Sequence, residues 1–69
     1  MIAGTREESF EEKTQRHISE TRNTIVGWEN ELKYATEKGD KEHEDYCNQM
    51  LVIWQNTLRD LEEILKKIL

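Results

Sequence analysis

Two residues with metal-binding side chains, His43 and Cys47, stand four positions apart in the sequence. Four positions are about one helical turn, so both side chains would lie on one helix face, a spacing found in zinc sites. Two copies of the chain could supply two of each. The alternative is that Cys47 is a small apolar core residue, the usual role of an unpaired cysteine. Since a zinc site needs three or four ligands, this pair alone predicts no metal and no cofactor.

The same two residues could form a nucleophile and its base. Such a pair needs a third group to orient the histidine, and no candidate for it stands out. His17 with Glu20 is a weaker pair, which fits a flanking histidine beside an exposed acid. The sequence contains no glycine-rich phosphate loop. We therefore expect no catalytic residues and a protein that is not an enzyme.

A third group combines aromatic, amide and basic side chains near the middle of the chain. Aromatic faces and amides suit a nucleobase, and Arg22 or Lys33 could meet a phosphate. Such a pocket would lie between protomers. The alternative is that the tryptophans are ordinary core residues. The candidate ligand-binding residues are Arg22, Trp28, Asn30, Lys33, Tyr34, Tyr46 and Gln49.

Composition limits the elements that can position these residues. The chain has 69 residues, 36% of them charged, with no proline and three glycines, which fits one small domain with few turns. Its net charge of -5 leaves no basic block for nucleic-acid binding. No apolar run is long enough to span a membrane, and residues 1–8 lack the apolar core of a signal peptide. We expect a cytoplasmic protein with neither a nucleic-acid nor a membrane partner.

The residues predict two helices joined by a tight turn. Gly39 can adopt the left-handed conformation that ends a helix, and Asp40 can cap the next one. Two starts fit the first helix, because Thr5 and Ser9 are each followed by glutamate three positions later. We predict a disordered N-terminus over residues 1–4 and a single helical-hairpin domain over residues 5–69. Its helices span about residues 5–38 and 40–69.

Apolar and small residues alternate at steps of four and three in both helices, which is the heptad pattern of a packed helix pair. In an antiparallel hairpin, the sequence numbers of two facing residues add up to the same value along the whole hairpin. Leu32 with Cys47 and Ile25 with Trp54 both give 79, whose midpoint is the turn at Gly39-Asp40. Two independent patterns and a turn signal therefore agree on an all-α antiparallel hairpin.

A lone hairpin cannot cover its own apolar surface. Met50, Thr57 and Ile64 widen the second stripe, and residues 46–58 contain no charge. Both features predict assembly as a four-helix bundle, as a dimer or a larger homo-oligomer. The predicted oligomer core is Ile18, Ile25, Trp28, Leu32, Cys47, Met50, Leu51, Trp54, Leu58, Leu61, Leu65 and Ile68. A predicted outer interface belt comprises Val26, Gly27, Tyr34, Tyr46, Val52 and Ile53.

In its length, turn position and heptads, the chain resembles the bundle of two antiparallel hairpins formed by the plasmid-encoded Rop protein. The likeness extends only to the fold, and the acidic charge argues against an RNA-binding role. The sequence favours a small non-enzymatic oligomeric interaction module, an adaptor, regulator or inhibitor that binds a partner protein. The alternative is an oligomer that sequesters a small molecule, for example a phage-type inhibitor holding a nucleotide signal between protomers.

Overall fold

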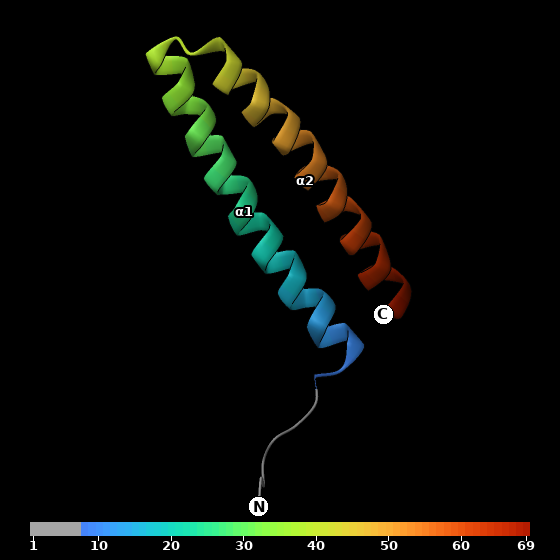
Figure 1. Ribbon diagram of the computed structural model, residues 1–69. Coiled ribbons are helices and arrows are strands. Elements are labelled where there is room, and N and C mark those ends of the chain that lie inside the picture. Colours follow the sequence, from blue (N-terminus) through green and yellow to red (C-terminus); the bar gives the residue numbers. More distant parts are fainter. Residues whose placement is uncertain (1–7) are drawn as a thin grey trace, which may run out of the picture.

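The computed structural model describes residues 8–69 and contains two helices, α1 (Phe10–Lys38) and α2 (Lys41–Ile68). They run antiparallel, side by side, as a single layer (Figure 1). The prediction of an all-α helical hairpin is confirmed. The predicted disorder of residues 1–4 and the helix start at Thr5 lie outside the described residues.

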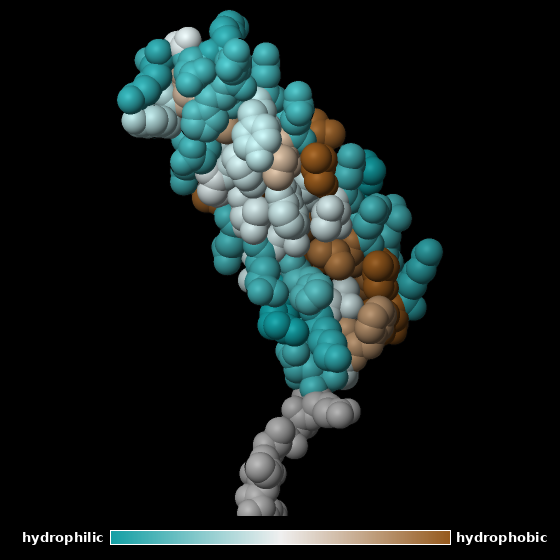
Figure 2. Space-filling view, viewed as in Figure 1, coloured by the Kyte–Doolittle hydropathy of each residue, from teal (hydrophilic) through white to brown (hydrophobic). Residues whose placement is uncertain are grey.

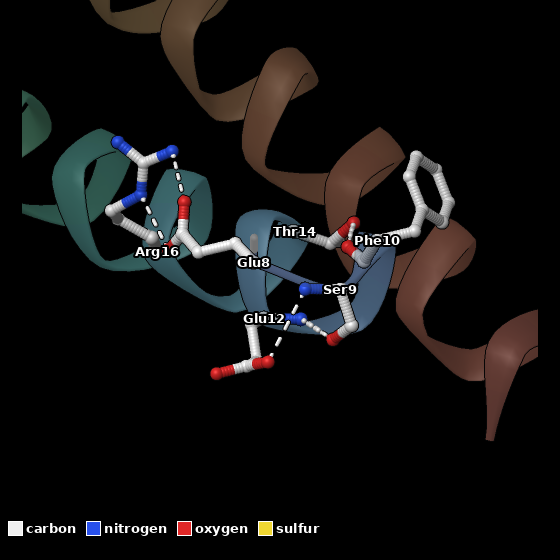
Figure 3. A network of polar contacts seen from close by, with 6 residues as sticks. All are labelled: Glu8, Ser9, Phe10, Glu12, Thr14 and Arg16. Atoms are coloured by element: carbon white, nitrogen blue, oxygen red, sulfur yellow. Dashed lines mark hydrogen bonds and ion pairs between the residues drawn. The ribbon is translucent and has the colours of Figure 1, made fainter. Parts of the chain in front are cut away.

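Helix α1 begins with a capping box at Ser9, the second of the two predicted starts (Figure 3). The backbone N–H of Glu12 donates to the Ser9 hydroxyl at 3.1 Å, and the Ser9 N–H donates to the Glu12 carboxylate at 3.2 Å. One turn later, the Thr14 hydroxyl donates to the Phe10 carbonyl at 2.8 Å. The first backbone groups of α1 are therefore satisfied locally at its start, Phe10.

The turn between the helices follows the predicted chemistry. Gly39 has a left-handed φ of 72°, and its N–H donates to the Thr36 carbonyl at 3.1 Å. The Asp40 N–H donates to the Ala35 carbonyl at 3.0 Å. The Asp40 carboxylate then accepts from the His43 N–H at 3.2 Å and caps α2. Two residues thus end one helix and start the next.

The core is one narrow stripe between the helices, at the positions of the two heptad patterns. Helix α1 contributes five buried residues and α2 two, whereas the tryptophans and most leucines of the stripe are only half-buried. Ile68, at the end of the stripe, is 37% exposed. The buried residues are Thr14, Ile18, Thr21, Ile25, Ala35, Cys47 and Leu51. A single hairpin therefore leaves much of its apolar surface uncovered.

Candidate interaction face

The hairpin has two broad faces, one on each side of the buried stripe. In heptad notation the stripe occupies positions a and d, so positions g and c fall on one face and positions e and b on the other. A side-chain contact across each face supports this assignment. His43 Nε2 lies 3.3 Å from Glu31 Oε2 on the first face. Arg22 Nη2 lies 2.8 Å from Glu62 Oε2 on the second.

The first face, which we call the apolar face, carries most of the exposed apolar side chains. Phe10 is 64% exposed, Ile53 55%, Tyr46 53%, Tyr34 51% and Ile64 39%. Figure 2 shows this face. In that view α1 runs upward on the left and α2 runs downward on the right. In two right-handed helices placed in this way, positions g and c point toward the viewer. Hydrophobic and near-neutral side chains form a band there between hydrophilic margins. Exposed apolar side chains gathered on one face are typical of an interaction surface.

Aromatic contacts hold the part of the apolar face nearest the turn. The Trp28 and Tyr46 rings meet edge to face, with centroids 5.6 Å apart and an interplanar angle of 75°. The Lys38 ammonium lies 4.8 Å from the centre of the Tyr34 ring. The Trp28–Tyr46 contact joins α1 to α2, whereas the Lys38–Tyr34 contact lies within α1, and both tyrosines stay about half exposed. The two tyrosines therefore remain available for contact with another molecule.

A hollow of about 290 Å³ opens farther along the same face. Its lining comes from both helices and combines three threonines with a histidine, a glutamate, a tryptophan and a leucine. The lining residues are His17, Glu20, Thr21, Thr24, Trp54, Thr57 and Leu61. The Trp54 indole N–H is buried and has no hydrogen-bond acceptor within residues 8–69. The heptad positions of His17, Thr24 and Thr57 could have located this hollow from the sequence, but only in combination with the hairpin register.

We call the second face the polar face. The residues of the predicted outer belt are divided between it and the apolar face. Val26 and Val52 lie at position b on this face, 53% and 57% exposed. Gly27, Tyr34, Tyr46 and Ile53 lie at position c on the apolar face. The six residues are therefore not one surface. A second hollow, of about 350 Å³, lies on the polar face near the open end of the hairpin, and Arg22 and Glu62 form part of its wall.

The seven candidate ligand-binding residues are spread around the hairpin. Trp28 and Tyr46 are in ring contact, and Tyr34 shares their face. Arg22 lies on the polar face, where its guanidinium pairs with Glu62. The other three point away from the apolar face by their heptad positions: Asn30, Lys33 and Gln49. A pocket that uses all seven would therefore need surfaces from more than one chain.

The candidate metal pair is separated by burial. Cys47 is fully buried in the stripe between the helices, whereas His43 lies on the apolar face beside Glu31. Burial raises the pKa of the Cys47 thiol, and the nearby Glu31 charge raises it further. A raised pKa disfavours the thiolate that a metal or a nucleophilic reaction requires. Within residues 8–69, no group of three histidine, cysteine or acidic residues is arranged to hold a metal ion.

Comparison with known proteins gives no match to a family model, a curated protein or a solved structure. Neither of the two described helices is long and apolar enough to cross a membrane.

Proposed function

We propose that the chain is a small non-enzymatic protein-interaction module that assembles as an oligomeric four-helix bundle. In this proposal the apolar face packs against the helices of another copy, and a dimer is the smallest closed assembly. The polar face, with Val26 and Val52, stays available to a partner protein. The module would then act as an adaptor, regulator or inhibitor by occupying that partner's surface.

One observation carries the proposal: of the nine large apolar side chains that are exposed within residues 8–69, five share one side of a single helical layer. Phe10, Tyr34, Tyr46, Ile53 and Ile64 share that side, and each is at least 39% exposed. A two-helix layer must cover such a face with another layer to form a closed core. Aromatic and aliphatic residues at the centre of a charge-depleted segment are also the usual composition of an interface core.

Two adjacent residues provide a matched test. Ile53 and Val52 are almost equally exposed, at 55% and 57%, but lie on opposite faces. We expect Ile53→Glu to place a charge within the assembled interface and to reduce the solution mass toward that of the 8.3 kDa chain. Val52→Glu should leave the mass unchanged. Light scattering after gel filtration, over a range of concentrations, measures both.

Circular dichroism of both variants shows whether the helices persist. Equal masses for Ile53→Glu, Val52→Glu and the unsubstituted chain would contradict the proposed role of the apolar face. A monomeric unsubstituted chain at every concentration would contradict the oligomeric module itself.

A further inference from the structure

We infer that two copies of the chain pack apolar face against apolar face, with their turns at opposite ends. The twofold axis that relates the two copies crosses α1 at Thr24. The inference rests on the proposed function and orients the second copy that it requires. Three features of the apolar face support this orientation: its area, the position of its hollow and the order of its charges.

The apolar face is large enough for a stable dimer. Helix α1 has 29 residues, which at the standard rise is a length of about 43 Å. Two helices side by side are about 20 Å wide, so the face measures about 850 Å². Each partner in an interface of standard size contributes about 800 Å². A second copy that overlaps the full length of the face therefore suffices to cover it.

When the two copies overlap fully with their turns at opposite ends, the two α1 helices lie against each other and run antiparallel. Each residue at position g of one α1 then meets a residue at position g of the other. Thr24 is the middle one of five such residues, so it meets Thr24 of the second copy. His17 then meets Glu31 of the second copy, which places an imidazole beside a carboxylate at two symmetric points. Phe10 meets the aliphatic stem of Lys38. No like charges face each other along these five positions.

The hollow gives an independent reason for the same orientation. With the turns at opposite ends, the hollow lies opposite Met50 and Thr24 of the second copy. Met50 is half-buried on the face of its own chain, and a methionine side chain adapts readily to an irregular cavity. With the turns at the same end, each hollow of about 290 Å³ would face the other and remain unfilled.

The charges at the margin of the face also disfavour the same-end arrangement. In the same-end arrangement, α1 of one copy faces α2 of the other. A residue of α1 then lies opposite the residue of the other copy's α2 for which the two sequence numbers add up to about 80. Glu20 would face Asp60, and Lys13 would face Lys67. With opposite ends, Glu20 instead lies level with Gly27 of the second copy, and Lys13 lies level with Tyr34, a favourable cation–aromatic neighbour.

Cysteine cross-linking tests the orientation in a chain that also carries Cys47→Ala. A short bismaleimide should link Thr24→Cys to itself and convert most of that variant into a covalent dimer. A mixture of His17→Cys and Glu31→Cys chains, one carrying a size tag, should give the mixed dimer after unfolding and refolding together. A mixture of His17→Cys and Asp60→Cys is the control, because those residues come together only in the same-end arrangement. Mass spectrometry identifies each product.

Linkage of His17→Cys to Asp60→Cys, without linkage of His17→Cys to Glu31→Cys, would overturn the inferred orientation. The light-scattering mass of a dimer would then leave the proposed function standing. A monomeric mass would overturn both. If Cys47→Ala prevents folding, the same cysteine substitutions can be made in the chain that keeps the buried Cys47. The unsubstituted chain then shows how much cross-linking Cys47 itself gives.

Discussion

Cys47 illustrates how one residue changes its chemistry when the hairpin closes. By type and spacing it could be a metal ligand or a nucleophile with His43, and both roles need a thiolate. In the structure its side chain is fully enclosed between α1 and α2. Burial and the Glu31 charge both raise the pKa of the thiol. The folded chain therefore holds this sulfur protonated and out of reach of reagents.

We expect the native chain to react slowly with a thiol reagent at pH 8 and the urea-unfolded chain to react at the rate of a free cysteine. The physical reason is that alkylation needs an exposed thiolate. Measuring the rate with and without urea checks this expectation. A native rate equal to the unfolded rate would contradict the burial of Cys47.

The raised pKa also predicts how stability changes with pH. The unfolded thiol loses its proton at a lower pH than the folded one, so deprotonation favours the unfolded state. The contribution of Cys47 is complete below the unfolded pKa of about 8.5 and is lost as the pH rises above it. Urea denaturation at pH 7 and pH 10 should show a loss of stability that is smaller in the Cys47→Ala variant.

At the scale of the helix, the ends of α1 are defined by short-range hydrogen bonds. The capping box of Ser9 and Glu12 satisfies backbone groups at one end, and the left-handed Gly39 does so at the other. We expect Ser9→Ala to lower the free energy of unfolding by about 1 kcal/mol, because it removes the hydroxyl that accepts from Glu12. Ser19→Ala, within α1 and exposed, is the control and should not destabilise. Urea denaturation measures both variants.

Two glycines predict opposite responses to alanine. Gly39 has a φ of 72°, where a Cβ is strained although none of the described neighbours lies within 4 Å of it. Gly39→Ala should therefore cost about 1 kcal/mol of stability. Gly27 lies within α1 and has ordinary helical geometry, and a Cβ there would also meet none of the atoms of residues 8–69 within 4 Å. Gly27→Ala should instead stabilise the chain by about 1 kcal/mol.

Thermal unfolding of both glycine variants at one protein concentration checks these signs. Destabilisation by Gly27→Ala would mean that something approaches Gly27 closely in the assembled protein. The single hairpin offers no such neighbour within residues 8–69.

At the scale of the whole molecule, the proposed oligomer makes stability depend on concentration. Unfolding of a dimer releases two chains, so a hundredfold increase in protein concentration adds about 2.7 kcal/mol per dimer. We expect the thermal midpoint to rise by several degrees over that range. The midpoint of Ile53→Glu should not move with concentration. Scanning calorimetry or circular dichroism at the two concentrations makes the comparison, and a midpoint that is constant for the unsubstituted chain would argue against assembly.

The sequence by itself determined the two helices, the turn at Gly39-Asp40 and the antiparallel stripe between them. These features depend on periodicity and on contacts within a few residues, which the order of residue types records directly. The capping box of Ser9 and Glu12 is of the same kind. Its alternative at Thr5 has the same residue pattern, so the pattern alone could not choose between them.

Only the tertiary structure decided which exposed residues share a surface. Val26, Val52 and Ile53 look alike in the sequence, yet the pairing of the helices puts both valines on the polar face and Ile53 on the apolar one. The same pairing brings the Arg22 guanidinium to Glu62 and, within residues 8–69, leaves the buried Trp54 N–H without a hydrogen-bond acceptor. The physical reason is that a helix turns 100° per residue, so neighbours in sequence diverge in direction. The face of the hairpin on which a residue lies is fixed only when a second helix packs beside the helix that carries this residue.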